Sequence, residues 1–189
     1  MKFPKWLLIV LVSITALWLL FNFVAWPYMK QETKKISSEQ TVTYTKNGMD
    51  LSITYSSPSK KGRVIFGELV PYDAVWRTGA NEPTTFTTTS DIRIVDQKLP
   101  SGTYSLWTKP GKEKWLVIFN KDIPDWGVTL ISGGSKTTRV AEEDVIELEV
   151  PVEETDEVIE NFTINFIDQG QLYMNLSWDS TKIKVPINN

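Results

Sequence analysis

Ten consecutive residues, 75–84, hold side chains that could recognise a ligand. The run reads Val-Trp-Arg-Thr-Gly-Ala-Asn-Glu-Pro-Thr and combines an aromatic ring, a guanidinium, a carboxamide and a carboxylate. Trp76 offers a stacking surface and Arg77 a two-pronged donor for anions, while Asn81 and Glu82 can recognise hydroxyl groups. We therefore predict a ligand-binding site of Trp76, Arg77, Asn81 and Glu82, suited to sugars or small polar ligands of a cell envelope.

The same run also has a purely structural interpretation. Arg77 would pair with Glu82 or Glu68, and Trp76 would fill the hydrophobic core, because buried pairs of this kind can hold a loop without any ligand. Gly79 would supply the positive φ that a tight turn requires. The sequence leaves the binding and the structural interpretation open.

A catalytic site is a further alternative. Two carboxylates that face each other about 5–10 Å apart can act as acid and base in glycoside cleavage. Glu68, Asp73 and Glu82 are the acids nearest the cluster, and Glu68 with Glu82 would be the pair in a hydrolase of envelope carbohydrate. Solvated or salt-bridged acids explain these residues more simply, so we do not expect an enzyme.

Composition narrows the chemistry. The chain contains no cysteine and no histidine, which removes the thiol nucleophile, the commonest general base and the commonest zinc ligands. The acid-rich stretch 142–160 does not have the spacing of an EF-hand loop. We therefore expect no metal site and no cofactor.

The charge balance argues against nucleic acid as a partner. Without Lys2 and Lys5, 18 basic residues stand against 23 acids, a net charge of −5. Affinity for nucleic acid depends on basic surface, so no nucleic-acid partner is expected.

The N-terminus predicts a membrane anchor. Residues 6–26 carry no charge, and at 1.5 Å per residue they span about 30 Å, the thickness of a bilayer core. Trp6 at one end and Trp26 with Tyr28 at the other would lie at the two interfaces. The run exceeds the apolar stretch of a cleavable signal peptide, and no small-residue cleavage pattern follows. A cleaved signal is the alternative to an uncleaved anchor.

These features divide the chain into four parts. We predict a short cytoplasmic segment at 1–5, a transmembrane signal anchor at 6–28, a polar stalk at 29–40 and a folded domain at 41–189. The lysines on the two sides of the apolar run are nearly balanced, so the orientation follows instead from the very short segment before it. We expect a single-pass membrane protein with its C-terminal domain on the exported side, periplasmic or extracellular.

Period-two alternation predicts that the folded domain is built of strands. Apolar residues alternate with polar ones around Asn47-Gly48, a hairpin-type turn, and again through 146–150, 162–166, 172–178 and 183–187. A short strand is also expected at Arg63–Phe66, and Glu153–Glu160 is the one place where a short helix is expected. The pattern indicates an all-β, antiparallel β-sandwich or jelly-roll-like domain after one N-terminal transmembrane helix.

Several motifs spread over residues 41–187 resemble one bacterial family, the domain-of-unknown-function family 2911. They include Ser57–Arg63, Phe66–Tyr72, Val75–Glu82, Leu99–Leu106, Trp115–Lys121, Phe162–Ile164 and Trp178-Asp179. The resemblance implies an exported, all-β bacterial protein and supplies no catalytic residues. Members of that family more often look secreted, so the intact anchor is a departure from the pattern.

Together these observations predict a membrane-anchored envelope protein that acts as a binding or interaction module. Its partner would be a polar small molecule, a glycan or another envelope protein. A carbohydrate-active hydrolase and a purely structural envelope domain are the two alternatives.

Overall fold

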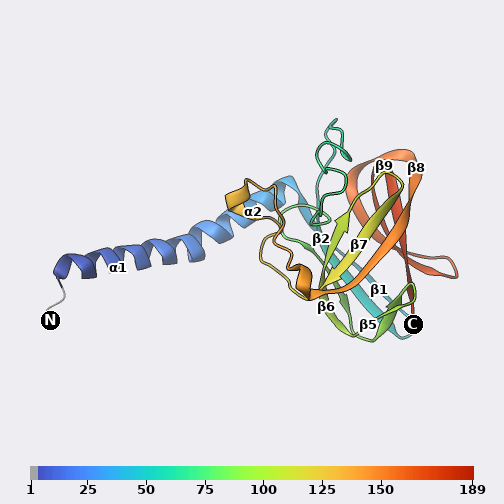
Figure 1. Cartoon of the computed structure of the whole chain (residues 1–189), viewed down its shortest axis with the longest axis horizontal. Coiled ribbons are helices and arrows are strands. Elements are labelled where there is room, and N and C mark those ends of the chain that lie inside the picture. The colour runs from blue at the N-terminus through green and yellow to red at the C-terminus, as the bar shows by residue number, and fades with distance from the viewer. Residues whose placement is uncertain (1–3) are drawn as a thin grey trace. The chain divides into compact units, whose positions relative to one another are not determined.

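The computed structural model describes residues 4–189 and divides into two compact units, Met1–Ile36 and Ser37–Asn189. The first unit is helical and the second is built of strands (Figure 1). Residues 1–3 of the predicted cytoplasmic segment lie outside the described part of the chain.

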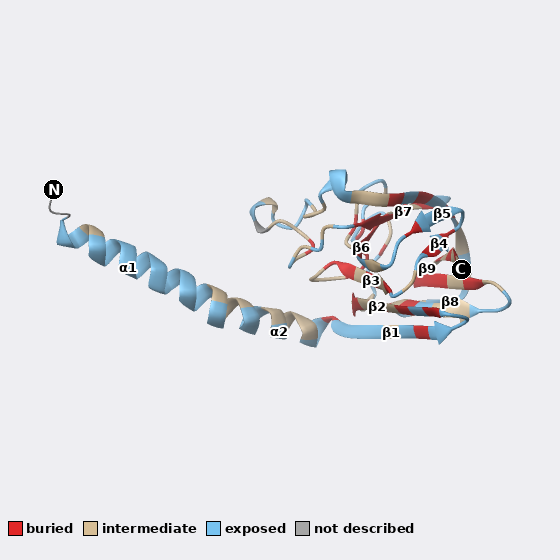
Figure 2. Cartoon of the chain, turned by 90° about the horizontal axis from the view of Figure 1, so that it is seen from below, coloured by how far each residue is buried: buried red, intermediate tan, exposed pale blue. Residues whose placement is uncertain are grey.

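The helical unit is one continuous helix, which consists of α1 (Lys5–Leu20), a wider π-helical turn η1 (Phe21–Ala25) and α2 (Trp26–Ile36). The wider turn precedes Pro27, whose ring cannot continue the regular hydrogen-bond ladder. The helix is exposed along α1 (Figure 2) and is long and apolar enough to cross a membrane, a test that a signal sequence also passes. It continues into the segment that we predicted as a polar stalk, and β1 follows from Ser38.

Nine strands form the second unit, and every pairing between them is antiparallel. Their bounds are β1 (Ser38–Lys46), β2 (Met49–Ser57), β3 (Thr84–Thr88), β4 (Ile92–Ile94), β5 (Gln97–Leu99), β6 (Gly102–Lys109), β7 (Lys114–Asn120), β8 (Asp144–Asp168) and β9 (Leu172–Asn188). Two short 3₁₀ helices, Leu130–Ser132 and Ala141–Glu143, lie between β7 and β8. The all-β antiparallel fold expected from the alternation is confirmed.

The strand order of the sheet is β1-β2-β3-β6-β7-β8-β9-β4-β5. The long strand β8 links β1, β2, β3, β6 and β7 on one side of it to β9, β4 and β5 on the other. Its first part pairs with β7 and its second part with β9. The register shifts between Glu154 and Ile159, and again between Ile159 and Thr163, as at β-bulges, which bend a strand. The prediction of a helix at Glu153–Glu160 is therefore wrong, because these residues belong to the irregular middle of β8.

One hydrophobic core fills the domain, and the residues that face it alternate along the strands (Figure 2). Aromatic rings bring separate strands together. Tyr55 of β2 meets Phe162 of β8 edge-on at 5.8 Å between ring centroids, and Phe86 of β3 meets Phe119 of β7 at 5.3 Å. The domain is therefore held mainly by strand faces that pack on each other.

The hairpin predicted at Asn47-Gly48 is confirmed. Both residues have positive φ, 54° and 77°, as a two-residue turn of this type requires. The strand predicted at Arg63–Phe66 is not present, since the backbone there turns back on itself. Val70 donates to the carbonyl of Ile65 at 2.9 Å, so this stretch pairs within its own loop.

Candidate functional site

Two long loops emerge from the strands and meet each other. The first, residues 58–83, connects β2 to β3, and the second, residues 121–143, connects β7 to β8. Loops of this length in a compact domain are uncommon and are often functional. The residues predicted as a ligand site all belong to the first loop.

Trp76 is part of the hydrophobic core and not an open stacking surface. Its side chain is 7% exposed, and its ring stacks on Trp178 at 6.0 Å with an interplanar angle of 16°. The indole Nε1 donates to the carbonyl of Gly79 at 3.0 Å. This geometry agrees with the structural interpretation of Trp76, and the cause is simple: the indole N–H finds its partner inside the loop, so the ring can be buried.

The bend that follows Trp76 is tightly fixed. Thr78 is fully buried at a φ of 56°, and its hydroxyl lies 3.1 Å from that of Thr108. A β-branched residue with positive φ is a strained conformation that persists only where its surroundings impose it. Gly79 follows with a φ of 148°, and a Cβ there would approach Ser56 O to 2.8 Å. The backbone beside Arg77 is therefore held rigidly.

The second loop packs against the first at Gly127. The N–H of Gly127 donates to the carbonyl of Asn81 at 2.9 Å. A Cβ on this buried glycine would lie 2.3 Å from Cδ of Arg77 and 2.8 Å from its Cβ. The absence of a side chain at Gly127 thus lets the stem of Arg77 lie directly on the second loop.

A cavity of about 350 Å³ opens between the two loops. Arg77 is the one charged residue among the twelve that line it, and all twelve belong to the described part of the chain. The lining residues are Leu69, Val70, Pro71, Ala74, Val75, Trp76 and Arg77 from the first loop, with Val128, Gly133, Gly134, Ser135 and Thr137 from the second. The side chains that line the cavity are therefore mostly apolar, with a single cation among them.

The charge of Arg77 has no neutralising partner among residues 4–189. Its side chain is half-buried, and Nε is buried without a hydrogen-bond acceptor. Burial is the one cause that lowers the pKa of this guanidinium, and no neighbouring carboxylate contributes to the shift. The pairing with Glu82 or Glu68 that the structural interpretation required is not found. A buried donor without an acceptor costs free energy unless water or a ligand satisfies it.

The remaining predicted residues lie outside this cavity. Asn81 has a φ of 62° and a buried Nδ2, and its role visible in the structure is the backbone contact to Gly127. Glu82 is half-buried just before β3, whereas Glu68 and Asp73 are exposed. The structure brings Trp76 and Arg77 to the cavity wall and leaves Asn81 and Glu82 beside it. Ligand binding by these residues stays a prediction.

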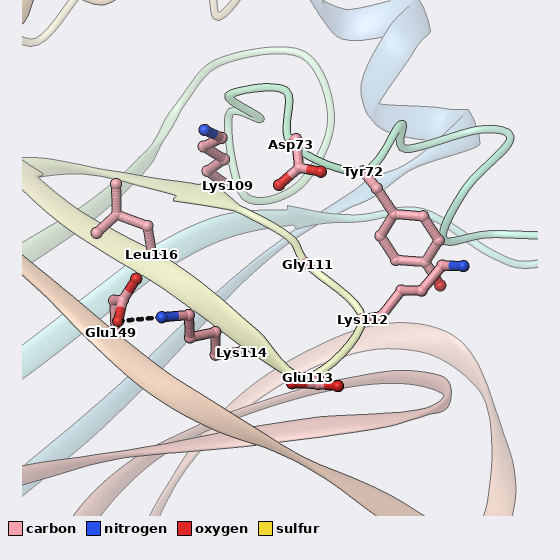
Figure 3. A pocket seen from close by; sticks show the side chains of 9 residues that line it. All are labelled: Tyr72, Asp73, Lys109, Gly111, Lys112, Glu113, Lys114, Leu116 and Glu149. Carbon is pink, nitrogen blue, oxygen red and sulfur yellow. Dashed lines mark hydrogen bonds and ion pairs between the residues drawn. The ribbon is translucent and has the colours of Figure 1, made fainter.

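A second cavity, of about 420 Å³, lies beside the turn between β6 and β7 (Figure 3). Its lining includes Tyr72 of the first loop, three lysines and three acids. The three lysines balance the three acids: Lys114 pairs with Glu149 at 2.6 Å, and Lys112 lies over the ring of Tyr72 at 5.9 Å. This cavity has no charge in excess, so it makes a weaker candidate than the Arg77 cavity.

The sequence did not indicate the part played by the second loop. Val128, Ser135 and Thr137 lie at least 51 positions beyond Arg77, and no local pattern predicts which loops meet. Gly127 was the one available signal, since a glycine beside an aromatic residue in a loop can mark a close approach. Among the described residues, no group of three acids lies close enough together to hold a metal ion.

The fold defines the class of protein: an all-β antiparallel domain that follows an apolar N-terminal helix. The family model described as "Protein of unknown function (DUF2911)" matches residues 37–187, and the chain belongs to that family. The match covers the strand unit and begins where the helical unit ends. No curated protein and no solved structure matches the chain.

Proposed function

We propose that this protein is a membrane-anchored binding module of the cell envelope, with its ligand site in the cavity between the loops 58–83 and 121–143. The observation that carries the proposal is Arg77, whose Nε is buried without an acceptor, in the wall of a cavity whose other lining side chains are uncharged. A cavity of about 350 Å³ has the size of sites that bind small molecules. Of the partners expected from the sequence, a small molecule suits it better than a glycan chain or a protein.

The proposed location follows from the helix Lys5–Ile36. Its apolar part would remain in the membrane as an uncleaved anchor, and the strand unit would lie on the exported side. A phosphatase reporter that is active only outside the cytoplasm, fused after Asn189, tests this arrangement. Reporter activity in the membrane fraction is expected, and an inactive reporter would contradict export.

Binding itself is tested with a metabolite and glycan panel on the full-length chain in non-ionic detergent, followed by isothermal titration calorimetry. We expect at least one small molecule to bind the wild-type chain, and Arg77→Ala to lose that binding while the fold is retained. If Arg77→Ala lowers thermal stability and no compound binds, the domain is structural and the proposal fails.

The hydrolase alternative gains no specific support. Glu68 and Glu82 do not line the Arg77 cavity, and the two residues differ in burial. Paired carboxylates in catalysis flank a shared substrate. Glu68→Gln and Glu82→Gln therefore serve as controls, and neither substitution is expected to abolish ligand binding.

A further inference from the structure

The Arg77 cavity has a chemical character that narrows its ligand, provided that the proposed binding function is correct. Six lining residues carry purely aliphatic side chains: Leu69, Val70, Pro71, Ala74, Val75 and Val128. Gly133 and Gly134 also line the cavity but contribute only backbone atoms, and both have positive φ, 63° and 89°. Such walls favour an apolar body, because contact with them removes apolar surface from water.

Polar side chains are few in this cavity. Besides Arg77, the indole N–H of Trp76 and the hydroxyls of Ser135 and Thr137 are the side-chain groups that can hydrogen-bond. The indole already donates to Gly79, and Ser135 Oγ donates to the carbonyl of Ser132 at 2.9 Å. A neutral sugar would bring many hydroxyl groups to a site whose side chains offer few of them a partner, which disfavours binding.

The charge of the cavity instead favours an anionic ligand. The guanidinium of Arg77 is half-buried among aliphatic side chains, and a carboxylate offers it paired, charge-assisted hydrogen bonds. One cation neutralises one negative charge, so a dianion would leave a charge unpaired in the same apolar site. The loop backbone beside Arg77 is fixed by the bend at Thr78 and by the contact with Gly127, which preorganises the cation for this role.

We infer that the cavity binds a small organic monoanion, a carboxylate on a compact apolar body, with the carboxylate at Arg77 and the apolar body against the aliphatic walls. The inference concerns the class of ligand alone and assigns no reaction.

Calorimetric titration of the full-length chain in non-ionic detergent tests this inference, with empty micelles as the blank. The probes are butyrate, hexanoate and benzoate as carboxylates, hexanamide as the neutral match of hexanoate, and succinate as a dianion. Octanoate and palmitate extend the series toward lipid-derived acids. We expect hexanoate or benzoate to bind at least tenfold more tightly than hexanamide and succinate, and palmitate to bind no better than octanoate.

Variants separate the charge from the shape of the site. Arg77→Met keeps a long apolar side chain and removes the charge, and it is expected to weaken carboxylate binding at least tenfold while leaving the weak binding of hexanamide unchanged. Lys121→Met removes an exposed charge of the second loop outside the cavity and is expected to have no effect. Thermal unfolding of Arg77→Met should occur at the wild-type temperature or above it, because the uncompensated charge is gone.

The outcomes distinguish the two proposals. Equal binding of hexanoate and hexanamide, or equal carboxylate binding by wild type and Arg77→Met, would overturn the anion inference. If a neutral metabolite binds in an Arg77-dependent manner, the proposed binding function stands and the ligand class is wrong. If palmitate binds far more tightly than octanoate, the site takes a lipid chain and not a compact acid. If no compound of any class binds, both proposals fail.

Discussion

Trp76 and Thr108 exchange two backbone hydrogen bonds, with N···O distances of 2.7 and 3.0 Å. Trp76 belongs to the loop 58–83, whereas Thr108 belongs to β6. This bridge ties the middle of a long loop to a core strand. Because the ring of Trp76 is buried on the same side as Trp115 and Trp178, the residue that precedes Arg77 is fixed by both its backbone and its side chain.

Replacement of Trp76 should therefore act on stability. Trp76→Ala is expected to lower the free energy of unfolding by about 3–5 kcal/mol, the usual cost of removing a buried large aromatic side chain. Trp76→Phe should cost less, since a ring remains and one hydrogen bond to Gly79 is lost. Urea denaturation of the full-length chain, followed by circular dichroism, measures both. A Trp76→Ala chain of wild-type stability would show that the ring is not a core element.

Gly127 allows the two loops to approach each other. In Gly127→Ala the new methyl group would overlap the stem of Arg77, since the expected distances are 2.3 Å to Cδ and 2.8 Å to Cβ. We expect a loss of about 1–3 kcal/mol in stability, as for other overpacked sites, together with displacement of Arg77 from the cavity.

A double-mutant cycle checks the cause. Arg77→Ala removes the nearest overlapping atom, so Gly127→Ala should cost less in the Arg77→Ala background than in the wild type. Strictly additive effects would mean that the loops do not meet at these two residues.

The strands could be predicted from the sequence because each apolar alternation has a partner strand that buries it. The stretches at 146–150 and 172–178 lie in β8 and β9 as expected. The middle of β8 escaped prediction because its acids and apolar residues do not alternate, and its register with β9 shifts twice in the same stretch. A run without period two and rich in Glu was assigned to helix, although pairing with β9 determines its conformation.

Only part of the candidate site could be predicted from the sequence, because the site depends on contacts between distant loops. The composition of residues 75–84 singled out Arg77, and the structure places that residue in a cavity wall. The binding interpretation treated Trp76 as an exposed ring and the structural interpretation placed it in the core, because composition cannot tell which side of a loop faces the core. The opposite wall comes from the loop 121–143, and contacts between distant loops leave no periodic signal in the sequence.

Asp144 holds the end of the second loop. Its carboxylate accepts a hydrogen bond from Asn120 Nδ2 at 2.7 Å and forms an ion pair with Arg139, and the Asp144 and Arg139 side chains are only 10% and 16% exposed. Asp144→Ala would leave two buried donors without this acceptor, so we expect a loss of about 1–3 kcal/mol in the free energy of unfolding. Chemical denaturation provides the measurement. The exposed Asp125 of the same loop offers a matched control, and Asp125→Ala should be neutral; equal effects of the two substitutions would refute the role of Asp144.

Tyr55 makes the stability of the fold sensitive to alkaline pH. Burial raises the pKa of its phenol above the ordinary value of 10.0. The folded chain therefore keeps the proton when the unfolded chain has lost it, so this contribution is complete below about pH 10 and is lost as the pH rises toward the folded pKa.

Tyr55→Phe should flatten the decline of stability above about pH 10 without abolishing it, because the pKa of Tyr104 is also raised by burial. The hydrogen bond of Tyr55 is long, at 3.4 Å, so the cost at neutral pH should stay below about 1 kcal/mol. Thermal unfolding between pH 7 and pH 11 measures the slope, with the half-buried Tyr173 as the control in Tyr173→Phe. An unchanged alkaline slope in Tyr55→Phe would mean that other groups control it.

The apolar helix should determine where the protein resides in the cell. A variant that lacks residues 1–36 retains the whole strand unit, Ser37–Asn189, and is expected in the soluble fraction, whereas the full chain is expected in the membrane fraction. Ile14→Lys puts a charge in the middle of the apolar stretch, where insertion costs about 2.5–3.5 kcal/mol, and should reduce membrane insertion. Gln31→Lys, beyond the apolar stretch, is the matched control.

Fractionation combined with mass spectrometry separates anchor from signal peptide. An uncleaved anchor requires that the membrane-bound protein has the mass of the full 189-residue chain, since the apolar helix is then still present. A shorter, soluble protein would instead identify the helix as a signal sequence that is removed. If the variant without residues 1–36 remained in the membrane fraction, the strand unit itself would have to bind the membrane, and the helix would not be the sole anchor.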